Sequence, residues 1–181
     1  PITSGDPNAD PIDQYIYISS PSAGDVNFTI NIIGSNSVSG TVSNASPYRY
    51  PISTAGYSSF VQDPATTSRV TSDRGFIIEA DSPIYVSVRL NAGNNAQAGA
   101  LVSKGENALG TTFRIGTYDN QGSPGSNYLN FFSFMATEDN TTVNLTSNNT
   151  SGLVIENFGT SQFPINNIVL NRGQSYTVAV R

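Results

Sequence analysis

Cysteine, histidine and tryptophan are all absent from the 181 residues. Without cysteine the chain has no disulfide framework, no thiol nucleophile and no iron–sulfur cluster. Without histidine it has no Ser-His-Asp or Cys-His catalytic set and no His-ligated zinc. The sequence also lacks a run of about 18 apolar residues, which a membrane-spanning helix would need.

Charged residues are scarce as well. They make up 12% of the chain, whereas a typical soluble domain has about 25%. The formal net charge is -5 and Lys104 is the single lysine, so the sequence has no basic stretch of the kind that binds nucleic acid. Serine, threonine and asparagine take the place of the missing charges. The composition excludes nucleic acid as an expected partner.

The residues that are present predict a folded β protein. Nine tyrosines and nine phenylalanines, with many valines and isoleucines, can offset the entropy of ordering the chain. Apolar and polar residues alternate over 26–32 (VNFTINI) and over 84–90, which is the pattern of a half-buried strand. The same alternation predicts strands at residues 14–19, 76–80, 113–115 and 176–180. Residues 129–136 are apolar on both faces and predict a central strand.

Helix signals are weak throughout. The best helical candidate, residues 96–108, is interrupted by Gly99 and Gly105 and is expected to be a loop or one short turn. Short strands separated by turn residues indicate an all-β fold of antiparallel β-sandwich-like units in tandem. A propeller-like arrangement is the alternative.

Weak internal repeats predict how these units follow one another. Segments of the first half recur in order in the second: 26–29 with 143–146, 39–42 with 151–154, 50–53 with 163–166, and 55–58 with 172–175. We predict an N-terminal arm at 1–14, a first β unit at 15–90, a connector rich in glycine, alanine and asparagine at 91–110, and a second, related β unit at 111–181. Because the second unit ends just after its last strand, we expect it to be cut short.

The N-terminal arm carries a candidate metal site. Asp6, Asn8 and Asp10 alternate along it, with Asp13 nearby. Oxygen ligands at every second residue can wrap Ca²⁺, which takes about six to eight hard oxygens. The EF-hand pattern is incomplete, because a proline stands in place of its glycine. The hypothesis is a structural calcium ion, and the alternative is a solvated arm whose aspartates begin turns. No other cofactor is predicted.

A tyrosine-rich segment is the candidate ligand site. Tyr48 and Tyr50 lie on one face of a predicted strand, with Arg49 between them and Tyr57 nearby. Tyrosine rings stack on sugars, and arginine binds hydroxyl groups. This pattern predicts a glycan platform. The alternative is a sheet surface in which the tyrosines stabilise cross-strand pairs.

Catalysis is not expected. The possible pairs of catalytic carboxylates come from Asp73, Glu79, Asp81, Glu138 and Asp139. Glycoside hydrolysis needs two carboxylates at a set separation, and three of these acids stand beside turn residues, where they favour turn formation. We therefore predict a protein that is not an enzyme and has no catalytic residue.

Several segments share features with known surface proteins. They are residues 14–19 (QYIYIS), 81–89 (DSPIYVSVR), 97–105 (QAGALVSKG) and 136–143 (ATEDNTTV). Together they resemble the N-terminal region of large surface proteins that gliding Bacteroidota export by the type IX system. Residues 109–116 (LGTTFRIG), 135–143 (MATEDNTTV) and 170–178 (LNRGQSYTV) are similar to the N-terminal domain of IgGFc-binding, mucin-like proteins.

The resemblance implies a secreted, multidomain protein with a signal peptide before Pro1 and an anchoring or secretion signal downstream. It offers no catalytic residues, and immunoglobulin binding, which belongs to animal members, is not carried over. Residues 137–142 are expected to form a tight hairpin in which Asp139 and Asn140 bond their own backbone.

We expect a non-enzymatic, extracellular cell-surface module for adhesion, gliding motility or surface assembly, within a larger secreted protein. Its expected partners are glycans or other surface proteins, including copies of itself. A carbohydrate-binding module of a polysaccharide-degrading enzyme is the alternative.

Overall fold

The computed structural model describes residues 11–52, 62–92, 98–116, 130–148, 154–157 and 163–180. Strands dominate this part of the chain, and its two short 3-10 helices are η2 (Pro64–Thr66) and η4 (Gly105–Ala108). The strands pair antiparallel in four sheets, which confirms the predicted all-β, sandwich-like fold. Among the described residues, no helix has the length and apolar character that crossing a membrane requires.

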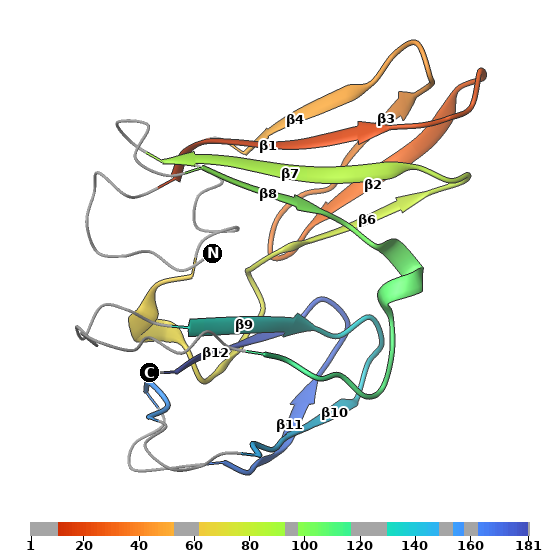
Figure 1. Ribbon diagram of the computed structural model, residues 1–181. Coiled ribbons are helices and arrows are strands. Elements are labelled where there is room, and N and C mark those ends of the chain that lie inside the picture. Colours follow the sequence, from red (N-terminus) through yellow and green to blue (C-terminus); the bar gives the residue numbers. More distant parts are fainter. Residues whose placement is uncertain are drawn as a thin grey trace.

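Two sheets form the first sandwich (Figure 1). One has the strand order β4-β1-β7-β8 and the other the order β3-β2-β6. The strands are β1 (Pro11–Ser19), β2 (Val26–Ile32), β3 (Val38–Val42), β4 (Tyr48–Ile52), β6 (Phe76–Ala80), β7 (Tyr85–Ala92) and β8 (Ala98–Val102). The strands predicted at 14–19, 26–32, 76–80 and 84–90 are confirmed, with small shifts at their ends.

Alternating side chains build the first core. Along β2, Phe28 and Ile30 are buried while Asn27 is exposed, and the buried residues face Ile16 and Ile18 of β1. A fully buried side chain of this size contributes about 1.5–3 kcal/mol relative to an exposed one. The apolar period of two therefore fixes which face of each sheet turns inward and which is left to solvent.

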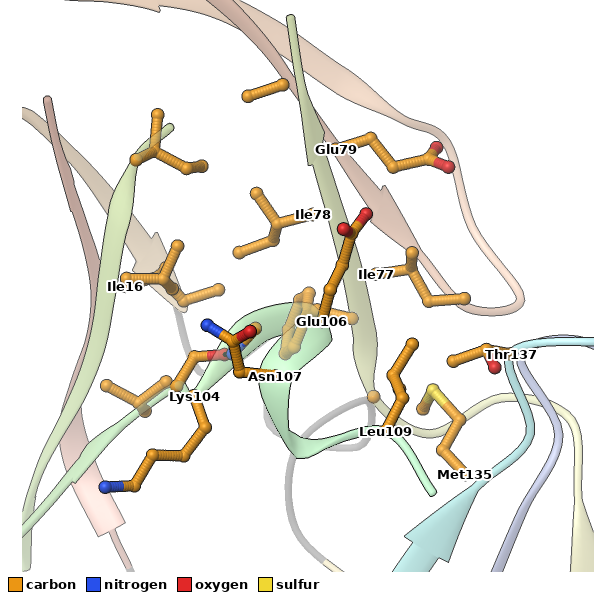
Figure 2. A pocket seen from close by; sticks show the side chains of 18 of the residues that line it. Ile16, Ile77, Ile78, Glu79, Lys104, Glu106, Asn107, Leu109, Met135 and Thr137 are labelled. Carbon is orange, nitrogen blue, oxygen red and sulfur yellow. Dashed lines mark hydrogen bonds between the residues drawn. The ribbon is translucent and has the colours of Figure 1, made fainter. Parts of the chain in front are cut away.

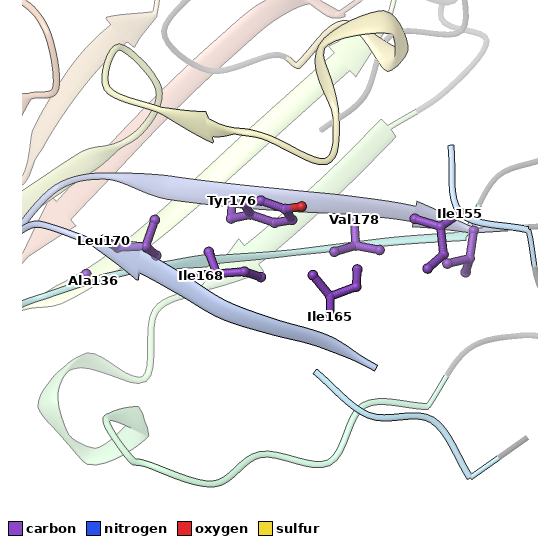
Figure 3. Close-up of a cluster of buried hydrophobic side chains, with 8 residues drawn as sticks. Ala136, Ile155, Ile165, Ile168, Leu170, Tyr176 and Val178 are labelled. Carbon is purple, nitrogen blue, oxygen red and sulfur yellow. The ribbon is translucent and has the colours of Figure 1, made fainter. Parts of the chain in front are cut away.

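A second pair of sheets lies beside the first sandwich (Figure 1). Its strands are β5 (Val70–Thr71), β9 (Asn130–Met135), β10 (Thr141–Leu145), β11 (Ile165–Leu170) and β12 (Ser175–Val180), in the orders β5-β12-β9 and β10-β11. Figure 3 shows Tyr176 and Val178 of β12 packed with Ile165, Ile168 and Leu170 of β11. Burial raises the pKa of the Tyr176 hydroxyl above its usual value, and a side-chain hydrogen bond partly offsets this rise.

The central strand of this region differs from the predicted one. All six residues of β12 are buried, and it lies between β5 and β9. The strand predicted at 176–180 is confirmed, but the central position predicted for 129–136 is wrong, because β9 ends its described sheet and Phe131 is 46% exposed. An apolar run on both faces of a strand indicates that both faces are largely buried. It does not distinguish an edge strand from a central strand.

Two further strand predictions need correction. Residues 113–115 form no strand, and Phe113 and Ile115 are exposed. No described strand pairs with them, and three alternating residues do not hold an extended ladder alone. The segment expected to be a loop or short turn, 96–108, contains both η4 and strand β8. β8 forms by backbone pairing with β7, from Asn91↔Ala98 to Ser87↔Val102. Such pairing requires little from side chains, so alternation does not reveal it.

The predicted hairpin at 137–142 is also wrong. These residues connect β9 to β10, which belong to different sheets. The Asp139 carboxylate accepts a hydrogen bond from the backbone N–H of Arg172 at 2.9 Å, and the backbone N–H of Asn140 donates to the Asn171 side chain at 3.1 Å. The β11–β12 turn thus holds Asp139 and Asn140, while the local contact in this corner runs from the Thr141 hydroxyl to the Glu138 backbone carbonyl at 2.8 Å.

The segment just before β6 connects the second core to the first sandwich. β5 pairs with β12 of the second core, and Gly75 then leads the chain into β6 of the first sandwich. Gly75 has a φ of +106°, and a Cβ at this position would overlap the Cε atom of Met135. The Glu79 carboxylate of β6 forms an ion pair with Arg172 at 2.7 Å. The division of the chain at 91–110 stays a prediction.

Candidate functional site

The predicted metal loop lies mostly outside the described residues. Asp6, Asn8 and Asp10 are not among them, and of Asp13 only the backbone is described, which pairs with that of Asn91. Within the described part of the chain, no three acidic side chains come together in a way that would hold a metal ion. Calcium binding therefore stays a prediction.

The structure divides the predicted tyrosine platform between two faces of β4. Tyr48 and Tyr50 share the inward face and border the first core, where the Tyr48 ring centroid lies 4.9 Å from that of Phe28. Arg49 is exposed on the opposite face. Tyr57 lies outside the described residues. Among the described residues of this platform, Tyr48 and Tyr50 thus pack against the core while Arg49 is exposed to solvent.

A different aromatic group occupies the outer face of the four-stranded sheet. Tyr15 and Tyr17 alternate with buried isoleucines along β1, so they point away from the first core. The registers Tyr17↔Arg49 and Tyr15↔Arg89 place one arginine on each side of them, from β4 and from β7. Tyr85, at the start of β7, is on the same face and is 64% exposed. We call these five residues the Tyr–Arg face.

Cation–π contacts hold the arginines against the rings. The Arg49 Cζ atom lies 4.8 Å from the Tyr15 ring centroid, and the Arg89 Cζ atom lies 6.0 Å from that of Tyr17. The two tyrosine centroids are 6.0 Å apart. Each exposed contact of this kind contributes about 0.5–1 kcal/mol. Both arginines are exposed, so the contacts orient the guanidinium groups without removing them from solvent.

The rest of this sheet face combines small polar side chains with aliphatic ones, and the register also brings the backbone of Asp13 to it, opposite Asn91. Residues paired directly across neighbouring strands share a face, which assigns the following side chains to it in addition to the Tyr–Arg face: Ser19, Pro51, Ser87, Asn91, Ala100 and Val102. None of these is acidic, and among the described residues neither Arg49 nor Arg89 has an ion-pair partner. The charged side chains that the structure describes on this face are thus the two arginines, on a chain whose net charge is -5.

Of the five residues of the Tyr–Arg face, the sequence predicts a ligand-binding role for Arg49 alone. The alternation in QYIYIS places both tyrosines of β1 on one face. Arg49 and Arg89 are 40 positions apart in the sequence, and only the strand register shows that they flank the same two rings. The pattern that indicates such a site is an aromatic strand flanked by two strands that each carry an outward arginine. It can be recognised only when the strand order is known.

A wide cleft of about 1450 Å³ lies at the joint between the two sandwiches. Figure 2 shows Ile77 and Glu79 of β6, Glu106 of η4, Leu109 and Met135 around it. It is larger than the pockets of about 300–1,000 Å³ that enclose small ligands, and both glutamates are exposed. We interpret it as the open space between two packed units rather than as an enclosed ligand pocket.

The acids that the sequence offers as catalytic pairs have structural contacts instead. Their partners, by ion pair or hydrogen bond, are Arg74 for Asp73, Arg172 and Asn31 for Glu79, Asn27 for Asp81, and the Arg172 backbone for Asp139. Glu138 is exposed. No two of these carboxylates are buried together, because each of them is exposed. A hydrolytic mechanism with two carboxylates in one closed site has no support here.

A β-sandwich with an exposed aromatic and cationic face has the features of a binding module. The comparison with protein families agrees with this class: residues 98–180 match the family described as IgGFc binding protein. The chain is similar to that family over this part, which is less than half of its length. The family is named for binding and not for a reaction. Neither the curated proteins nor the solved structures include a match to the chain.

Proposed function

We propose that this chain is a non-enzymatic binding module of an extracellular surface protein, that it serves adhesion, and that the Tyr–Arg face is its binding surface. The observation that carries the proposal is the pair of exposed arginines held over two tyrosines on one side of a sheet. Gliding motility, surface assembly and self-association stay predictions of the resemblance.

The geometry of the face suits attachment. An antiparallel sheet holds its side chains in rows, and Tyr15 and Tyr17, whose side chains have few rotatable bonds, hold the two guanidinium groups in place. Tyrosine and arginine are the residues most often found where binding energy is concentrated. Because their partners on the sheet already fix them, ordering them on binding costs little additional entropy.

The similarity to the IgGFc binding protein family supports a binding role and does not locate it. The match begins at residue 98, whereas all five residues of the Tyr–Arg face precede that position. Immunoglobulin Fc is therefore included among the tested ligands, although the Tyr–Arg face is not assigned to it. If the chain binds it through residues 98–180, the binding surface differs from the one proposed.

Retention on coated surfaces tests the proposal. Beads carrying the chain are passed over a set of neutral and acidic glycans, glycoproteins and immobilised Fc. The Tyr15→Thr/Tyr17→Thr variant keeps strand propensity but removes the rings. The matched control is Phe113→Thr/Phe131→Thr, which removes two exposed rings from elsewhere.

We expect retention on at least one surface, lost in the tyrosine variant and kept in the control. Retention that survives loss of both tyrosines, or that falls only in the phenylalanine variant, contradicts the proposal. So does the absence of retention on every surface in the set.

A further inference from the structure

We propose that the Tyr–Arg face binds an anionic polysaccharide, with Arg49 and Arg89 each receiving a carboxylate or sulfate group. This inference rests on the proposed function, because it names the ligand class of the same face. It assigns the charge-bearing role to the arginines and a positioning role to Tyr15 and Tyr17.

A ligand that approaches this surface meets guanidinium groups before it meets aromatic rings. The guanidinium groups lie over the Tyr15 and Tyr17 rings, so the flat ring faces are not left bare for a neutral sugar to stack on. Guanidinium is planar and always charged, and its forked N–H groups match carboxylate-type anions in a bidentate manner. The face is therefore better suited to anions than to uncharged sugar rings.

The distance between Arg49 and Arg89 suits a ligand with repeated acidic groups. Arg49 and Arg89 stand on β4 and β7, with β1 between them and an offset of two residues. Two strand spacings and this offset put their Cα atoms about 10–12 Å apart. That separation is comparable with the length of a disaccharide, so acidic groups that repeat along a polysaccharide can reach both arginines.

The local charge of this sheet face differs from the net charge of the chain. Charges separated by more than about 8 Å are largely screened at physiological ionic strength. The described side chains on this sheet face include two arginines, and the one acid whose described backbone the register brings to it is Asp13, opposite Asn91. The arginines outnumber this acid, so the surface attracts anions although the net charge of the chain is -5. Ser19 and Ser87 add hydroxyl groups to the face, as a hydrated glycan requires.

A protein partner fits this face less well. The centre of a stable protein interface is apolar and depleted of charge. Pro51, Ala100 and Val102 are aliphatic side chains that the register places here, with Pro51 two residues from Arg49 along β4 and Ala100 directly opposite Arg89. The apolar side chains are therefore interspersed with the charged ones instead of forming an apolar centre. We therefore assign the face to a glycan, and an acidic polypeptide becomes a probe in the test.

Calorimetric titration with four defined polymers tests the inference. The probes are polygalacturonate, which carries carboxylates, dextran sulfate, neutral dextran, and polyglutamate. The test variant is Arg49→Gln/Arg89→Gln. The matched control is Arg69→Gln/Arg114→Gln, which removes the same charge at two exposed arginines outside the four-stranded sheet. Arg49→Lys/Arg89→Lys keeps the charge and removes the fork.

We expect one or both acidic glycans to bind, and dextran and polyglutamate to bind far more weakly. Each arginine lost lowers the affinity about tenfold, as expected for a hydrogen bond to a charged group, so the double glutamine variant binds about a hundredfold more weakly. The affinity of the lysine variant lies between that of the glutamine variant and that of the unchanged chain. The control variant binds as the unchanged chain does.

Equal affinity for dextran, or equal affinity of the glutamine variant and its control, overturns the inference. Polyglutamate binding as tightly as the acidic glycans overturns the assignment to a glycan. If dextran binds and the tyrosine variant abolishes this, the anionic ligand is refuted while the binding face stands. If no polymer binds and no coated surface retains the chain, both proposals fail together.

Discussion

Gly75 provides the sharpest test of the joint between the two sandwiches. Its φ of +106° is rarely adopted by residues with a side chain, and an added Cβ would overlap the Cε atom of Met135. We predict that Gly75→Ala lowers the free energy of unfolding by about 1–3 kcal/mol. The backbone strain contributes about 1–2 kcal/mol, and crowding of Met135 adds to it. The lower entropy of the unfolded alanine chain offsets about 0.4–1 kcal/mol.

Urea denaturation followed by tyrosine fluorescence measures this loss. Gly24→Ala is the matched control, because the nearest atom to its added Cβ is 3.9 Å away, so we expect no loss of stability. Combining Gly75→Ala with Met135→Ala separates the two causes, since the double variant keeps the strain and removes the overlap. A Gly75→Ala variant as stable as the Gly24→Ala variant would refute the described path of the chain at the joint.

Three further predictions concern the second core and the N-terminal arm. Leu170→Ala, at a residue that is 0% exposed, should cost about 2–5 kcal/mol in urea denaturation, whereas Val169→Ala, at 52% exposure, should cost under about 1 kcal/mol. Equal losses at the two sites would contradict the placement of the second core. Because burial raises the pKa of Tyr176, its contribution to stability is complete below about pH 10 and is lost as pH rises above it. Urea denaturation at increasing pH should therefore show a smaller loss of the free energy of unfolding for Tyr176→Phe than for the unchanged chain. The same pH dependence in both would contradict a buried hydroxyl. If the loop with Asp6 and Asp10 binds calcium, calcium should raise the melting temperature relative to chelator, and equal melting temperatures remove that hypothesis.

The sequence predicts the strands of the first sandwich well, for a physical reason. In β2 and β7, apolar residues alternate with polar ones over at least five positions, and one face of each strand is covered by the opposite sheet. The same physics fails for β8, whose AGALV residues lie at a sheet edge and are held by backbone pairing. It also fails for 113–115, where the alternation is present and no partner strand is described.

The candidate site is less predictable than the fold, because it depends on register. Tyr48, Arg49 and Tyr50 form a recognisable pattern, and a single strand shows correctly that the arginine points away from the tyrosines. It does not show which face is the core. The pairing of β4 with β1 settles this, since Tyr50 lies opposite the buried Ile16 and Arg49 lies opposite Tyr17. A pairing shift of one residue would reverse both assignments.

The proposed binding surface lies on the outer face of the first sandwich. Chemical-shift mapping of the backbone amides, with polygalacturonate and dextran sulfate added in separate titrations, tests it most directly. We predict that the largest changes for a bound polymer occur in β1, β4 and β7, centred on Tyr15, Arg49 and Arg89, and that they disappear in Arg49→Gln/Arg89→Gln. Changes confined to residues 98–180, or an unchanged spectrum with both polymers, would contradict the claim.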